Sequence, residues 1–133
     1  MKFSFFKSKE LDFKESNIRN ALTALNAVKN ILEHCTYDGV DNFKNRIPYL
    51  EEIEAAIKSK NAEVLRKLVI NAELIGGAGA IWEINIDEEN YRKEFDKQFP
   101  NFLDSLMQIG IKNGRLKQVR DGFIKINSNT SQQ

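Results

Sequence analysis

The chain of 133 residues is long enough to bury one hydrophobic core, and we expect a single domain. Hydrophobic residues make up 41% of it and charged residues 29%, which excludes a wholly disordered protein. Lys and Arg number 20 against 19 Asp and Glu, so the net charge is +1. A nearly neutral chain lacks the long-range attraction that nucleic acids and anionic membranes exert on their partners, and we expect neither as a partner.

A first helix is expected to begin after Asp12, which is placed to form a capping box with Glu15. Apolar residues then recur every three or four positions, which aligns them in one stripe that faces the core. This stripe consists of Ile18, Leu22, Leu25, Val28, Leu32 and Cys35. A turn is assigned to residues 37–39, because Gly39 adopts positive φ angles without strain.

A second helix contains Pro48, which lacks a backbone N–H, so we predict a start between Asp41 and Ile47 with the proline in the first turn. Asn61 is predicted to be the N-cap of a third helix. The apolar face of that helix consists of Val64, Leu65, Leu68, Val69, Ala72 and Ile75. Gly76 is expected to end it in the left-handed conformation.

The predicted fold changes direction within segment 71–86, because the helical spacing of apolar residues stops there. This segment holds the only tryptophan, Trp82, and three of the seven glycines: Gly76, Gly77 and Gly79. Apolar residues alternate over residues 81–86, which indicates either a short strand or an extended linker. Residues 123–126 also include two β-branched isoleucines, so a pairing of these two segments is one prediction.

Asp87 is placed to cap a fourth helix, whose acidic first turn suits the positive end of the helix dipole. The apolar stripe continues across Pro100, where we expect a kink or a break, and the helix should end at Gly110. Residues 115–120 are predicted to add one or two further helical turns.

These elements predict a mainly α fold, a bundle of four to five helices with a Gly-rich turn and at most one short two-stranded β element. Residues 1–126 are expected to form a single helical domain, followed by a disordered polar tail over residues 127–133. The apolar N-terminal run ends at Lys7, too early for a signal peptide, and no segment approaches the roughly 20 apolar residues of a membrane span. With Cys35 as the only cysteine, no internal disulfide can form, and we expect a cytoplasmic protein.

The sequence offers no recognisable catalytic set. The glycine cluster lacks the Gly-Lys-Ser/Thr of a phosphate-binding loop. His34 and Cys35 are adjacent, so on a helix their side chains diverge by about 100° and a nucleophile pair is not expected. A single histidine also leaves zinc and di-iron sites without ligands, and we predict no metal and no cofactor. The clusters 51–54 and 87–89 are interpreted as solvated helix faces, with an oxygen-only magnesium or calcium site as the alternative.

Charge is unevenly distributed near the C-terminus. Residues 83–98 carry six acids and three bases, whereas residues 99–133 carry five bases and two acids. We expect these segments either to pair with each other or to be solvated. Alternatively, four basic residues face an acidic partner: Arg115, Lys117, Arg120 and Lys125.

The third helix, the Gly-Gly-Ala-Gly-Ala stop over residues 76–80 and the pair Trp82-Glu83 resemble a family of small uncharacterised bacterial domains. In that family a helix, a polar link and a second helix lead into Gly-Gly-x-Gly-Ser and a hydrophobic-acidic stretch. The resemblance covers residues 21–86, and Ala80 stands where the family usually has serine. Some of these domains look like immunity or accessory proteins, so the resemblance implies a binding role and supplies no catalytic residue.

We therefore expect a non-enzymatic protein-binding domain, in one form an immunity protein that blocks a toxin partner. The residues predicted to form the binding site are Glu73, Gly76, Gly77, Gly79, Trp82 and Glu83. One alternative is a small-ligand or enzyme site beside the glycine turn. The other is a homodimeric structural module that uses the aromatic face of the fourth helix. The sequence is therefore compatible with both a monomer and a homodimer.

Overall fold

The computed structural model describes residues 10–41, 43–76 and 80–131. The predicted fold class is confirmed, because these residues form a mainly α bundle that is about 75% helical and has no strand. The number of helices is larger than expected. The α-helices are α1 (Glu15–His34), α2 (Ile47–Lys58), α3 (Ala62–Val69), α4 (Ala72–Ile75), α5 (Glu89–Ile109) and α6 (Gly114–Ser131).

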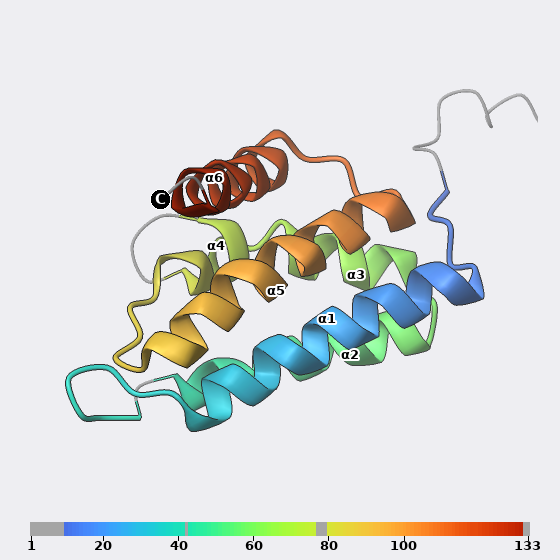
Figure 1. Cartoon of the computed structure of the whole chain (residues 1–133). Coiled ribbons are helices and arrows are strands. Elements are labelled where there is room, and N and C mark those ends of the chain that lie inside the picture. The colour runs from blue at the N-terminus through green and yellow to red at the C-terminus, as the bar shows by residue number, and fades with distance from the viewer. Residues whose placement is uncertain (1–9, 42, 77–79, 132–133) are drawn as a thin grey trace, which may run out of the picture.

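Helix α5 forms the middle of the bundle and lies between α1 on one side and α6 on the other (Figure 1). Helix α2 packs against α1 and α3, whereas the short α4 contacts α6 and the 3-10 helix η3 (Ile81–Glu83). A second 3-10 helix, η2 (Lys44–Arg46), leads into α2. The buried apolar residues form one core, which extends from α1 and α2 across α5 to α6.

Helices α1, α2 and α3 largely follow the prediction. In the predicted stripe, Leu25, Val28 and Leu32 are buried in α1, as is Cys35 just after it, while Ile18 and Leu22 are partly buried. Helix α2 begins at Ile47 with Pro48 in its first turn. The Asn61 side chain caps α3 by accepting a hydrogen bond of 3.1 Å from the backbone N–H of Val64. The predicted cap of α1 is wrong, because the Asp12 carboxylate accepts from the N–H of the non-helical residue Lys14 instead of from the first turn.

The third predicted helix is divided in two. It stops at Val69, and a second short helix, α4, runs from Ala72 to Ile75. Asn71 separates them, because its side-chain oxygen accepts a hydrogen bond of 2.8 Å from the N–H of Glu73. A side chain that satisfies a nearby backbone donor competes with the helical ladder, which explains the interruption within a continuous apolar pattern.

Asp87 holds the loop after α1 instead of capping α5, which begins at Glu89 without a side-chain hydrogen bond at its N-cap. The Asp87 carboxylate accepts hydrogen bonds of 3.0 Å from the backbone N–H groups of Asp38 and Gly39. It also accepts one of 2.9 Å from the Thr36 hydroxyl. The backbone N–H of Gly39, followed by that of Asp38, holds the pKa of Asp87 below its usual value. Gly39 has the positive φ expected of the turn.

The predicted β element is wrong. Residues 81–83 form η3, and the residues after it are extended but unpaired with any strand in the described part of the chain. Residues 123–126 belong to α6, which also includes residues 127–131 of the expected disordered tail. Leu116, Val119 and Phe123 are buried and share one face of α6, so packing on α5 stabilises this helix.

Helix α5 continues through Pro100 to Ile109, so the predicted break is wrong, and Gly110 follows with the positive φ of a helix end. Proline lacks the N–H that would bond to the carbonyl oxygen of Asp96, four residues earlier. Asn127 of α6 supplies another donor, because its Nδ2 lies 2.9 Å from that oxygen. A residue of the expected tail thus satisfies a carbonyl group whose usual helical donor is missing.

We predict that Asn127→Ala destabilises the protein by about 1–2 kcal/mol, because the carbonyl of Asp96 loses a donor in a partly buried position. Urea unfolding measures the change in free energy, with the exposed Ser128→Ala as control. In a Pro100→Ala background, alanine restores the backbone N–H, and the effect of Asn127→Ala should fall below about 0.5 kcal/mol. An equal loss of unfolding free energy in both backgrounds would show that the contribution of Asn127 does not depend on the proline.

Candidate functional site

Among the predicted site residues that the structure describes, Trp82 lines a cleft. Its ring is half-buried on η3, and its Nε1 donates a hydrogen bond of 2.5 Å to the carbonyl oxygen of Gly76. Glu73 and Glu83 are exposed and do not line this cleft. Two further predicted residues, Gly77 and Gly79, lie outside the described residues.

Arg115 on α6 fixes the Trp82 ring in place. Its Nε donates a hydrogen bond of 2.8 Å to the carbonyl oxygen of Ile75, and its Nη2 donates one of 3.4 Å to that of Gly76. The guanidinium carbon lies 5.2 Å from the centre of the Trp82 ring, within the range of a cation–π contact. The first turn of α6 is thereby tied to the end of α4 and to η3.

An apolar cleft of about 260 Å³, here called the Trp82 cleft, opens between η3, α5 and α6. Its lining residues are Trp82, Asp96, Arg115, Gln118, Val119, Gly122, Phe123 and Ile126. Ile126 is 53% exposed, so a large apolar side chain lies at its surface. A neighbouring cleft of about 240 Å³ shares three of these residues, Trp82, Asp96 and Phe123. Sequence reasoning missed Asp96 and all of the α6 residues as members of one site.

Asp96 is the acidic residue of both clefts. Burial raises the pKa of its carboxyl group, and the positive charge of Arg92 acts in the opposite direction. Within the described residues the Asp96 carboxylate makes no hydrogen bond or ion pair, although its backbone oxygen binds Asn127. A partly buried carboxylate in these surroundings favours a positively charged group nearby.

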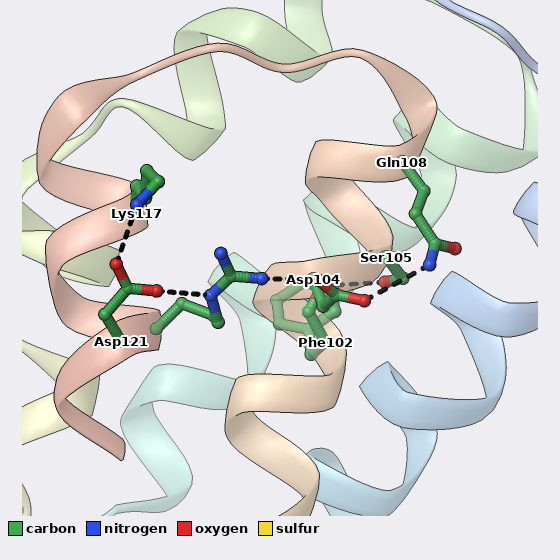
Figure 2. Close-up of polar contacts among 7 residues, drawn as sticks. Phe102, Asp104, Ser105, Gln108, Lys117 and Asp121 are labelled. Carbon is green, nitrogen blue, oxygen red and sulfur yellow. Dashed lines mark hydrogen bonds and ion pairs between the residues drawn. The ribbon is translucent and has the colours of Figure 1, made fainter. Parts of the chain in front are cut away.

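A chain of polar contacts joins α6 to α5 on another face (Figure 2). The Arg120 side chain is 19% exposed, and its Nη1 lies 2.6 Å from the Asp104 carboxylate. Its Nε lies 2.8 Å from Asp121, which also pairs with Lys117 at 2.9 Å. The second oxygen of Asp104 accepts a hydrogen bond of 3.1 Å from Gln108.

These contacts show which partners the charged residues of the C-terminal half pair with. Among the described residues no ion pair joins segment 83–98 to segment 99–133, so the two segments do not pair in the way that one prediction expected. Arg120 and Lys117 pair within their own segment, and Arg115 binds backbone carbonyl groups. Three of the four basic residues considered for an acidic partner are therefore engaged inside the molecule.

A polar groove of about 310 Å³ lies between α1 and α5. Its two charged residues are Arg19 and Asp104, and Asp104 is already paired with Arg120. The other lining residues are Asn20, Thr23, Ala24, Gln98, Asn101, Ser105 and Gln108. The groove therefore presents hydrogen-bonding side chains, but its two charged residues do not form a recognisable catalytic arrangement.

Cys35 and His34 do not form a reactive pair. Cys35 is fully buried, and burial, assisted by the negative charge of Glu88, raises its pKa to about 11. The thiol therefore stays protonated at neutral pH and is a poor nucleophile. His34 is exposed at the end of α1, where its Nδ1 lies 2.8 Å from the carbonyl oxygen of Asn30.

In the part of the chain that the structure describes, no group of three or more His, Cys, Asp or Glu side chains is placed to hold a metal ion. Likewise, none of the helices there is sufficiently long and apolar to cross a bilayer.

No protein-family model, curated protein or solved structure matches this chain. The likeness of residues 21–86 to small bacterial domains thus stays a prediction from the sequence. The Trp82 cleft, with its aromatic walls and its two charged residues, is the site on which a function can be argued.

Proposed function

We propose that the protein is a non-enzymatic protein-binding domain and that the Trp82 cleft receives a side chain of its partner. The observation that carries this proposal is an open apolar cleft walled by Trp82 and Phe123, with exposed Ile126 at its rim. Aromatic residues held in fixed positions dominate the binding energy of protein interfaces. Arg115 and the bond to Gly76 hold the Trp82 ring before any partner arrives, which lowers the entropy lost on binding.

The size of the cleft is sufficient for one large side chain of a protein partner. The Trp82 cleft has about 260 Å³ and the neighbouring one about 240 Å³. Each has room for one large side chain that projects from a partner surface.

An immunity protein that occludes a toxin in the cytoplasm is the specific form of this proposal. The resemblance of residues 21–86 to small bacterial domains supports it. A monomer that exposes the cleft suffices for this role, and occupation of the cleft by a second copy of the chain is the competing outcome.

Gly122→Leu tests the proposal without damaging the fold. Gly122 lines the cleft within α6, and apart from its chain neighbours and the adjacent backbone of α6 no atom lies within 4 Å of a Cβ added there. Leucine also favours helix over glycine by about 0.5–1 kcal/mol, so the variant should be at least as stable as the native protein. Its side chain fills the cleft, and we expect recovery of the partner to fall at least tenfold.

The measurement is affinity capture from the native host followed by mass spectrometry, together with protection of cells that express any toxin encoded by a neighbouring gene. Ser128→Leu is the matched control, because it adds the same side chain to an exposed position of α6 outside the cleft. A partner that binds both variants equally would exclude the cleft as its site. Recovery of no specific partner by the native protein, together with no protection against a toxin, would contradict the function itself.

A further inference from the structure

The Trp82 cleft contains an acidic group whose charge is not matched by a direct contact. Asp96 lines both neighbouring clefts, and so do the rings of Trp82 and Phe123. Its carboxylate makes no hydrogen bond or ion pair with the described residues, and burial raises its pKa. A carboxylate beside apolar walls is destabilised unless a donor or a cation pairs with it.

Two arginines line these clefts, but their donors are directed to the backbone. Arg115 donates to the carbonyl oxygens of Ile75 and Gly76 at 2.8 and 3.4 Å. Arg92 donates to those of Ile86 and Asp87, at 3.4 and 3.5 Å. Neither makes an ion pair with Asp96, so the acceptor capacity of that carboxylate is still available to a ligand.

The walls of the cleft suit a long side chain that is apolar along its stem and cationic at its end. Val119 and Ile126 provide an aliphatic surface next to the Trp82 and Phe123 rings. Arginine and lysine side chains bury their methylene groups on such a surface, and their charged ends interact favourably with aromatic faces. Arg115 and Arg92 repel a cation, but both donate to backbone carbonyl groups, whereas the Asp96 carboxylate has no direct partner among the described residues.

From this arrangement, and on the basis of the proposed function, we infer that the Trp82 cleft binds a basic side chain of the partner protein, with Asp96 as its anionic acceptor. The methylene groups of that side chain lie along Val119 and Ile126, and its cationic end pairs with the carboxylate. The partner therefore presents a projecting arginine or lysine on the surface that docks here.

The test uses N-acetyl-arginine methylamide as a probe of the whole protein in two-dimensional NMR. Trp82 is the only tryptophan, so its indole N–H gives one resonance that reports directly on the cleft. We expect saturable shifts of this resonance and of the Asp96 amide. The citrulline analogue has nearly the same shape without the charge, and it should bind at least tenfold more weakly, as expected for the loss of a charge-assisted hydrogen bond.

Asp96→Asn should reduce binding of the arginine probe to the level of the citrulline probe. Glu94→Gln is the matched control, because it removes one negative charge from α5 outside both clefts and should leave binding unchanged. Urea unfolding checks the fold, and Asp96→Asn should be at least as stable as the native protein, since it removes a desolvated charge.

Equal affinity for the arginine and citrulline probes would overturn the inference. So would tighter binding of N-acetyl-glutamate methylamide, which would assign the cleft to an acidic side chain held by Arg115 or Arg92. The probes need no partner, so this result is independent of the capture experiment. Capture that depends on the cleft, combined with no preference for arginine, would retain the proposed function and reject the basic side chain.

Discussion

Replacing Phe99 with alanine is expected to destabilise the protein by about 3–5 kcal/mol, as is usual for a buried phenylalanine. The Phe99 side chain is fully buried where α5 meets α6. Its ring stacks on Phe95, with 5.0 Å between the ring centres, and lies 5.4 Å from that of Phe123. The substitution leaves a cavity in this cluster, and small domains have only about 5–15 kcal/mol of total stability.

Urea unfolding followed by circular dichroism measures this loss. Lys93→Ala is the control, because it shortens an exposed side chain of the same helix and should change the free energy of unfolding by less than about 0.5 kcal/mol. A loss below about 1 kcal/mol for Phe99→Ala would mean that the contact of α6 with α5 contributes little to the stability of the fold.

Trp82→Ala is expected to destabilise the protein by about 2–3 kcal/mol, less than a fully buried tryptophan because its ring is half-exposed. The loss should be local. Without the indole, the Gly76 carbonyl loses a donor and Arg115 loses the ring beneath its guanidinium group. Both interactions hold α4, η3 and the start of α6 together, whereas α1 and α2 do not depend on them.

Hydrogen exchange resolved by residue measures where the stability is lost. Protection should fall in α4 and in the first turns of α6, while the amides of α1 and α2 keep theirs at low denaturant concentration. Trp82→Phe keeps an aromatic surface but no N–H donor, and it should show a smaller effect in the same places. A uniform loss of protection over the whole bundle would contradict the local role of Trp82.

The sequence predicts those elements whose determinants are close together along the chain. The stripe of α1, the start of α2 at Pro48 and the cap at Asn61 each depend on residues within one or two turns. The sequence also points to Trp82, because it is the only tryptophan and lies next to a cluster of glycines. Each of these features can be recognised without knowing what packs against it.

Two of the errors, those at Pro100 and in α6, depend on a partner that is distant in the sequence, whereas the one at Asn71 is local. Pro100 indicates a break unless Asn127 is known to bind the carbonyl oxygen that the proline leaves without its usual donor. In α6, Phe123, Ile124 and Ile126 favour a strand by propensity, but Phe123 packs on the α5 rings and the segment is helical. A single-residue cap at Asn71 divided one apolar pattern into two helices.

The candidate site was predicted only in part for the same reason. Asp96 and Arg115 are ordinary surface charges in the sequence, and they become site residues when α6 crosses α5 beside η3. Glu73 and Glu83 were chosen for their nearness to Trp82 along the chain, but the structure leaves both exposed and outside the cleft. Proximity in sequence identified the correct ring and missed the groups that surround it in space.

The buried thiol of Cys35 has a practical consequence for work on this protein. It is the sole cysteine of the chain, it is covered by the core, and its pKa is raised to about 11. Maleimides and haloacetamides react with exposed thiolates, so they should leave it intact in the folded protein. A second cysteine introduced at the rim of the Trp82 cleft would therefore be labelled selectively, and a photo-crosslinker attached there would mark whatever molecule docks.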